Sequence, residues 1–426
     1  MGVSLKKTSI AVLSLLTMLV VGLPAHAQIA VTEYPIPTPD SQASTIILGP
    51  DGNMWFTEPN TDKIGKSTPG GVITEYDVPT PDAAPTYAAV GPDGNIWFTE
   101  TFGDKIAKIT PGGIITEYAA PTASGYYLGI VAGPDGNLWF TEVFGNKIGK
   151  ITTAGAITEY DLPQADSQPV GITLGPDNNL WFTENGGDRL GKITPAGDIT
   201  EYTMPANSQP YGITTGPDNN LWMTENGGFG SIDQLNTSGT ILMRHPLSDA
   251  LATKPGWITT GPDSKLWSPL GNLSLLANVT TDGTLSGYQL SPDESIFAAG
   301  IAAGPDNTLW FTDVSQNKLG IISGLVEPNP SPAPETPATV AASSTAVPAH
   351  EASNGTTATE PAPAPSPLPD EPVAVKDAPR SSPSPAPSTP PAADYSLAMY
   401  SGAAVVGLAI LGLIGWLLLR LFARRT

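Results

Sequence analysis

Apolar and polar positions alternate in short runs over residues 28–323, and turn-forming residues interrupt each run. The runs NIWFTE from Asn95 and IITEY from Ile114 have a period of two residues, which is typical of strands with two different faces. The period of 3.6 residues that marks an amphipathic helix is missing from this region. The pattern therefore predicts an all-β fold.

One phrase is repeated along this region. GPDGNMWFTE begins at Gly49, and related copies follow every 41 to 45 residues, which is typical of solenoids and propellers. Each copy reads as four short strands, with Pro-Asp-Gly and Thr-Pro-Gly-Gly as tight turns. Four antiparallel strands make one blade, so seven copies predict a seven-bladed β-propeller. The copies begin at Gly49, Gly91, Gly133, Gly175, Gly216, Gly261 and Gly304.

The ends of the repeat predict how the ring closes. The last copy ends at Asn317–Ser323 without a fourth strand, whereas VTEY at Val31–Tyr34 precedes the first copy with no unit of its own. We expect Val31–Tyr34 to be the outer strand of the last blade. A six-bladed ring, or separate strands at the two ends, would leave one blade with an unpaired edge.

Within each second strand, Trp139 and Thr141 point to one face and Leu138 and Phe140 to the other. The tryptophan recurs at the same place in all seven copies, so we interpret it as packing between blades. The aspartate of each Gly-Pro-Asp, such as Asp135, is expected to form the turn at the opposite end of the strand.

The first 27 residues resemble a secretory signal. Lys6 and Lys7 precede an apolar run, and Ala25-His26-Ala27 is a small-x-small cleavage site. A membrane anchor is the alternative, but about 12 apolar residues are too few to span a bilayer. The prediction is an exported protein that begins at Gln28 after cleavage.

The other end predicts attachment to a membrane. Residues 324–394 are rich in Pro, Ala, Ser and Thr and are expected to form an extended, disordered stalk. Residues 395–419 carry no charge and predict one transmembrane helix, followed by a basic cytoplasmic tail at 420–426. The expected protein is a single-pass membrane protein with a monomeric propeller outside the cytoplasm.

The amino-acid composition excludes several kinds of functional site. The net charge of −21 argues against a nucleic-acid partner, and the absence of cysteine excludes disulfides and thiolate metal sites. Of three histidines, His26 lies in the signal and His350 in the stalk. His245 aligns with Tyr76 in an outer strand, so a Ser-His-Asp triad or a histidine metal site is not expected.

Carboxylates end most of the second strands. We expect them on one face of the disc, with Ser268 in place of the acid in the sixth copy. They predict either an acidic mouth that binds Mg²⁺ or Ca²⁺, with Asp313, Glu58, Glu225 and Glu184 as ligands, or structural roles in which each acid caps loop amides or pairs with the basic residue of the third strand. The acids are Glu58, Glu100, Glu142, Glu184, Glu225 and Asp313.

Aromatic residues occupy the loops at the same face. Such residues around an open mouth suit a glycan, peptide or protein ligand, but they equally suit simple plugging of the ring. The predicted ligand-binding residues are Phe102, Phe144, Tyr127, Tyr211 and Trp257.

The unit GITLGPDNNLWFTENGGDRLGKITPAGDITEY, from Gly171 to Tyr202, resembles the virginiamycin B lyase (streptogramin lyase) family, which is related to the NHL and SMP-30-like propellers. The resemblance covers residues 29 to 323 and implies a seven-bladed propeller. In the lyases of this family it also implies Mg²⁺ and two histidines that open a cyclic depsipeptide by elimination.

The residues that the resemblance assigns to catalysis are mostly replaced here. One histidine position is occupied by Gly256, and the Glu-x-His position reads Phe297-Ala298-Ala299, whereas Asp313 fits the family's carboxylate. We therefore expect a binding protein on a lyase scaffold without lyase activity. The alternative is a metal-dependent lyase or lactonase-like enzyme that uses a carboxylate site, and a third reading is a cell-envelope spacer.

Overall fold

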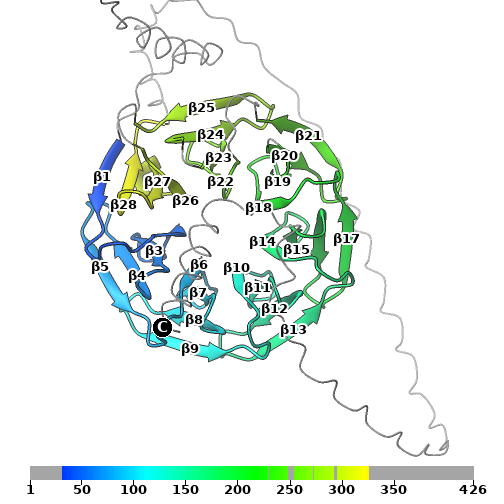
Figure 1. Cartoon of the computed structure of the whole chain (residues 1–426), viewed down its shortest axis with the longest axis horizontal. Helices are drawn as coiled ribbons and strands as arrows, with labels where there is room; N and C mark the ends of the chain where they lie inside the picture. The colour runs from blue at the N-terminus through cyan, green and yellow to red at the C-terminus, as the bar shows by residue number, and fades with distance from the viewer. Residues whose placement is uncertain (1–30, 229, 248–253, 272, 292–294, 326–426) are drawn as a thin grey trace, which may run out of the picture. The chain divides into compact units, whose positions relative to one another are not determined.

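The computed structural model describes residues 31–228, 230–247, 254–271, 273–291 and 295–325. This part of the chain folds into seven four-stranded antiparallel sheets around a central axis (Figure 1). The innermost strands of neighbouring sheets contact each other, and the last sheet contacts the first. The predicted seven-bladed β-propeller is confirmed.

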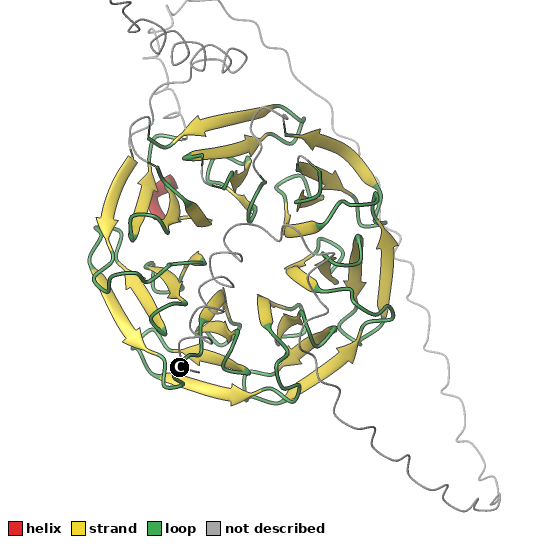
Figure 2. Cartoon of the chain, viewed as in Figure 1, coloured by secondary structure: helices red, strands yellow, loops and turns green. Residues whose placement is uncertain are grey.

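Each blade is a meander that runs outward from the axis, and Figure 2 shows its strands joined by short loops. The inner strands are β2 (Ile46–Leu48), β6 (Pro85–Val90), β10 (Tyr127–Ala132), β14 (Pro169–Leu174), β18 (Pro210–Thr215), β22 (Thr259–Thr260) and β26 (Ala298–Ala303). The second strands are β3 (Met54–Glu58), β7 (Ile96–Glu100), β11 (Leu138–Glu142), β15 (Leu180–Glu184), β19 (Leu221–Glu225), β23 (Leu266–Pro269) and β27 (Leu309–Asp313). The third strands are β4 (Lys63–Ser67), β8 (Lys105–Ile109), β12 (Lys147–Ile151), β16 (Arg189–Ile193), β20 (Ser231–Leu235), β24 (Leu275–Val279) and β28 (Lys318–Ile322). The outer strands are β5 (Ile73–Asp77), β9 (Ile115–Ala119), β13 (Ile157–Asp161), β17 (Ile199–Thr203), β21 (Ile241–Pro246), β25 (Leu285–Gln289) and β1 (Val31–Pro35), and one 3₁₀ turn, η1 (Pro305–Asn307), lies in the last blade.

The N-terminal strand closes the ring. β1 pairs with β28 in antiparallel register from Val31 opposite Ile322 to Pro35 opposite Lys318 (Figure 1). Asn317 then holds the chain that follows β1: its side-chain amide donates to the carbonyls of Ile36 and Thr38, and its carbonyl oxygen accepts from the backbone and hydroxyl of Ser41. The predicted closure is therefore confirmed, and its contacts are all non-covalent.

The repeated tryptophan packs between blades, as predicted. Trp139 is fully buried, packs among residues of the next blade and stacks on Tyr160 of its own outer strand, with ring centroids 5.5 Å apart. Its indole nitrogen donates to the Asp135 carboxylate at 3.1 Å. The Gly-Pro-Asp aspartate thus forms the turn, as expected, and also accepts from the buried indole. Although burial alone would raise the pKa of Asp135, hydrogen bonds from Asn137 and Trp139 lower it.

Replacing Asp135 should leave the Trp139 indole N–H without its acceptor. We expect Asp135→Ala to lower the free energy of unfolding by about 1–3 kcal/mol, measured by urea denaturation. Asp306 is a control, because in the last blade Trp310 donates to the Thr308 hydroxyl at 2.9 Å instead. Asp306→Asn should be nearly neutral, and an equal loss in both variants would contradict the assigned role.

The threonine of each second strand joins one blade to the next. Thr141 donates to the carbonyl of Val170 at 2.9 Å, and Thr312 makes the same bond to Ser44 across the closure. The sixth blade differs, because Pro269 stands at the threonine position and Ser268 faces Ala277. The residue in place of the acid is therefore Leu270, which is buried, and the expectation of Ser268 there is wrong by two residues.

The remaining predicted segments lie outside the described residues. These are the signal at 1–27, most of the stalk at 324–394, the helix at 395–419 and the tail at 420–426. Among the described residues, no helix has the length and apolar character that crossing a bilayer requires.

Candidate functional site

The carboxylates that end the second strands are buried inside the blades. All six have fully buried side chains. Each carboxylate points to the same side of its sheet as the residue two positions before it, as Glu58 does with Phe56. In the register of the blade, Glu58 stands opposite Lys63 of the third strand, which in turn stands opposite Asp77 of the outer strand. They therefore do not form the open acidic rim that the sequence predicted, because the loops between blades cover them.

In the first three blades this carboxyl group has no cation of its own. Lys105 pairs at 2.6 Å with Glu117 of the outer strand, and both carboxyl oxygens of Glu100 remain without a hydrogen-bond partner. Burial, followed by the nearby Glu117, raises the pKa of Glu100 to about 8. Glu58 and Glu142 behave alike: burial and then Glu75 or Glu159 raise their pKa values to about 8. Burial in these three blades therefore favours the protonated form of the carboxyl group.

The fourth and fifth blades pair the same carboxylate with arginine. The Arg189 guanidinium donates to Glu184 at 3.0 Å, so the structural pairing that the sequence offered is found there. In the fifth blade, Ser231 replaces the basic residue of the third strand, and the cation comes from Arg244 of β21. Arg244 bonds Glu225 and lies 3.7 Å from the buried Asp233.

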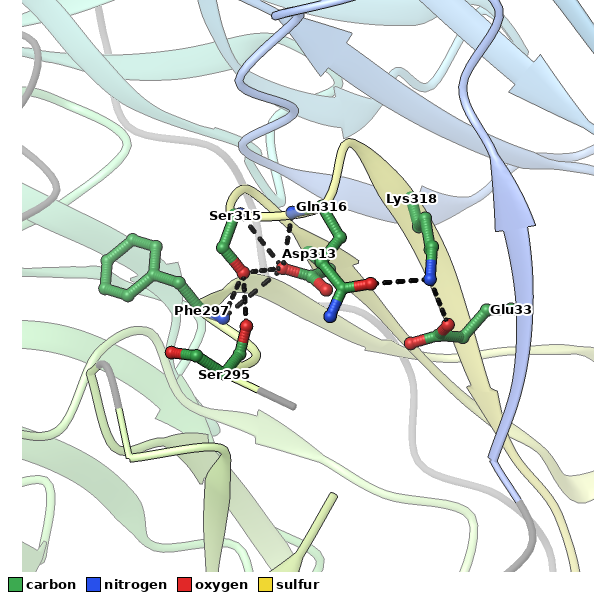
Figure 3. Close-up of polar contacts among 7 residues, drawn as sticks. All are labelled: Glu33, Ser295, Phe297, Asp313, Ser315, Gln316 and Lys318. Atoms are coloured by element: carbon green, nitrogen blue, oxygen red, sulfur yellow. Dashed lines mark hydrogen bonds and ion pairs between the residues drawn. The ribbon is translucent and has the colours of Figure 1, made fainter. Parts of the chain in front are cut away.

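Asp313 caps a loop in the seventh blade (Figure 3). One carboxylate oxygen accepts from the backbone amides of Phe297, Ser315 and Gln316, at 2.9 to 3.3 Å, and from the Ser315 hydroxyl at 2.6 Å. Lys318 instead bonds Glu33 of β1 at 2.6 Å. Burial raises the pKa of Asp313 in spite of these bonds. This carboxylate thus orders the loop that enters the last blade.

The predicted metal ligands Asp313, Glu58, Glu225 and Glu184 come from four different blades. Among the described residues, no three acidic, histidine or cysteine side chains are grouped so that they could hold a metal ion. At the positions where the resemblance implies histidines and a glutamate, Gly256, Phe297 and Ala299 offer no side-chain ligand. These residues do not fit a magnesium centre of the lyase kind.

Aromatic side chains gather at the face where the second strands end. Phe144 is 66% exposed and contacts Tyr126, which contacts Phe102, with ring centroids 4.8 and 5.5 Å apart. Burial raises the pKa of Tyr126 to about 12. Phe102, Tyr126 and Phe144 are named here the aromatic wall, and they come from blades 2 and 3.

A second aromatic group crosses the axis. Trp257 of blade 6 lies 4.6 Å from Tyr87 of blade 2 and 5.0 Å from Tyr211 of blade 5, measured between ring centroids. All three belong with Tyr126 to one apolar cluster. Burial, and then the neighbouring Tyr211, raises the pKa of Tyr87 well above its ordinary value. Tyr87, Tyr211 and Trp257 thus contact one another across the axis, as the plugging alternative predicts. The ligand-binding role of Phe102, Phe144, Tyr211 and Trp257 stays a prediction.

Tyr127 does not belong to the exposed face. It is fully buried, it contacts Phe140 of its own blade, and its hydroxyl donates to the Thr122 carbonyl. The neighbouring Tyr126 is half-buried and contacts Phe102 and Phe144, and its positive φ of 56° sets its backbone apart from the strand that follows. The sequence also places Tyr87 and Tyr126 among the aromatic residues at the entries of the first strands, although neither belongs to the predicted ligand-binding set.

His245 belongs to the outer strand of the fifth blade. It is the one histidine of the described residues, it belongs to β21, and it stacks on Trp222 with centroids 6.1 Å apart, as Tyr76 stacks on Trp55. Burial lowers its pKa. The prediction that His245 replaces an outer-strand tyrosine is confirmed.

The fold and this face define a class: a seven-bladed propeller with an aromatic plug and blades that bury their own carboxylates. The model of the virginiamycin B lyase family matches residues 23–208 and 176–342. The chain belongs to the virginiamycin B lyase family. A search of curated proteins finds no match.

Solved structures of streptogramin lyases are similar to this chain in sequence and in fold. A streptogramin B lyase is 38% identical, with a TM-score of 0.65, over 69% of this chain and 97% of that one. Virginiamycin B lyase from Staphylococcus aureus is 36% identical, with a TM-score of 0.65, over 70% and 99%. The same values hold for a catalytically inactive histidine-to-alanine variant of that enzyme with quinupristin.

Proposed function

We propose that this chain is a binding protein that has kept the streptogramin lyase scaffold without its lyase activity. The observation that carries the proposal is the placement of histidine. A relative that is 36% identical is inactive when one histidine is replaced by alanine. Here the one described histidine, His245, packs on Trp222 in an outer strand, and Gly256 and Ala299 stand where the resemblance implies histidines. Among the described residues, no histidine lies at the aromatic face to act as the base that abstracts a proton.

We further propose that the propeller is exported and displayed on a cell membrane. The supporting features are those of the sequence: the signal-like residues 1–27, the Pro-rich stalk and the uncharged residues 395–419 before a basic tail. Such a protein would present its propeller outside the cytoplasm, where it could meet a ligand.

Incubation with quinupristin tests the loss of lyase activity. Elimination would give a linear isomer of unchanged mass, so the product is followed by chromatographic retention and fragmentation. We expect no linear product from this chain with or without Mg²⁺, whereas the Staphylococcus aureus enzyme under the same conditions should give it. Linear product at a rate within about 100-fold of that enzyme would overturn the proposal.

A further inference from the structure

We propose that Trp257 is a gate at the axis of the ring, which swings away from Tyr87 and Tyr211 while the two tyrosines stay in place. In the closed state the three rings contact one another, and the Trp257 indole hydrogen-bonds the hydroxyls of both tyrosines. In the open state these hydroxyls are exposed at the axis. The movement is independent of which ligand the protein binds.

A buried threonine holds the inner strand in six of the seven blades. Its hydroxyl accepts from a backbone amide of its own inner strand at 2.8 to 3.3 Å and donates to a carbonyl of the next blade at 2.7 to 2.9 Å. Tyr87 is held in this way, because its amide donates to Thr99. In the sixth blade Pro269 stands at the threonine position and has no hydroxyl. The six are Thr57, Thr99, Thr141, Thr183, Thr224 and Thr312.

Trp257 lacks these backbone bonds. It stands four residues before the repeated Gly-Pro-Asp, as Thr45 does in blade 1 and Tyr87 in blade 2. Thr45 exchanges two bonds with Thr57: its amide donates to the hydroxyl at 3.1 Å, and its carbonyl accepts from the Thr57 amide at 3.0 Å. Trp257 can make neither bond with Pro269, because proline has no N–H and no hydroxyl. The two peptide groups that flank Trp257 are therefore not fixed by the second strand.

The preceding blade also lacks a side chain that holds strand entries elsewhere. Asp62 and Asp188 come directly before the third strands of blades 1 and 4, and each accepts from two backbone amides at the entry to the next inner strand, at 2.7 to 2.9 Å. Gly230 stands at this place in blade 5 and has no side chain to do the same for blade 6. In addition β22 has two residues, whereas β6 and β18, which carry Tyr87 and Tyr211, have six each.

Fixed points flank Trp257 on both sides. Gly256 donates to the Pro269 carbonyl at 2.8 Å and accepts from the Thr224 hydroxyl at 2.9 Å. On the other side, Ile258 is buried in an apolar cluster. The half-buried indole between them is held by its contacts with the two tyrosines. Because backbone hydrogen bonds oppose local opening, Trp257 should leave the axis before either tyrosine does.

Fluorine NMR of the full chain labelled with 5-fluorotryptophan tests the gate. Trp257→Phe and Trp139→Phe assign the two signals that are compared. We expect saturation transfer and relaxation dispersion to detect a second state at Trp257, with a population of about 1% or more and the chemical shift of an exposed indole. Trp139, which is fully buried between blades, should show one state. A single state at Trp257 in the unchanged chain overturns the proposal, whether or not any variant folds.

Pro269→Thr places at this position the residue that the other six blades carry, and it supplies both missing bonds. We expect it to lower the population of the second state about tenfold, as two hydrogen bonds of ordinary strength would. Pro262→Thr is the control, because it makes the same substitution in the Gly-Pro-Asp turn at the opposite end of β23, and it should leave the population unchanged. A population that Pro269→Thr does not lower, or that both variants lower equally, overturns the proposal.

Discussion

Removal of residues 28–37 should lower the melting temperature of the propeller by about 10 °C or more and broaden its transition. These residues include β1, which supplies the outer strand of the last blade, and Ile36, which is buried between that blade and the first. Their loss breaks the five residue pairs between β1 and β28 and the bond from the Asn317 side-chain amide to the Ile36 carbonyl, a loss of several kcal/mol. Calorimetry of the full chain and of the deletion variant measures it, and identical transitions would contradict closure by β1.

A point substitution distinguishes the loss of ring closure from the loss of the same hydrogen bonds within one blade. Asn317→Gly removes the side chain that joins the two ends of the ring and keeps a residue suited to its φ of 55°. Asn146 has the same φ and the same role in blade 3, where it bonds Gln164 and Ser167 within a continuous chain. We expect Asn317→Gly to lower the melting temperature at least twice as much as Asn146→Gly, because opening at Asn317 frees a whole edge of the ring.

Stability should fall as the pH rises from 6 to 9, by about 5 °C or more in melting temperature. Glu58, Glu100 and Glu142 have folded-state pKa values of about 8, against an ordinary value of 4.5. The folded state therefore holds more protons than the unfolded state between these limits. Stability is complete below about pH 4.5 with respect to these groups and is lost as the pH passes through 8, because ionisation then places a charge beside another carboxylate inside each blade.

The triple variant Glu58→Gln/Glu100→Gln/Glu142→Gln should flatten this dependence, since glutamine stays neutral at every pH. Glu117→Gln is a second probe within blade 2. Although burial opposes it, hydrogen bonds from Lys105 and Thr80 lower the pKa of Glu117, so its loss should reduce stability at pH 6, and because its charge also helps to raise the pKa of Glu100, the loss should be smaller at pH 9. A triple variant with the slope of the parent protein would show that other groups carry the pH dependence.

The sequence by itself determined the architecture. Seven copies of one phrase, with strand periodicity and turn residues at fixed places, specify seven like sheets, and the unmatched Val31–Tyr34 specifies how the ring closes. These features are local or repeated, so period and turn chemistry are enough to predict them. The packing of the tryptophans and the place of His245 followed from the same register.

Only the tertiary structure decided what the residues at the face do. Alternation along a strand gives the side on which Glu100 points, but its burial depends on loops from the neighbouring blade. Lys105 pairs with Glu117 and not with Glu100, because the outer strand brings the Glu117 carboxylate within 2.6 Å of its amine. Tyr126, which has a positive φ, contacts Phe102 and Phe144 whereas Tyr127 is buried, and Tyr87 meets Trp257 only because closure brings blades 2 and 6 together across the axis. Contacts between distant blades depend on the geometry of the whole ring, which no single repeat encodes.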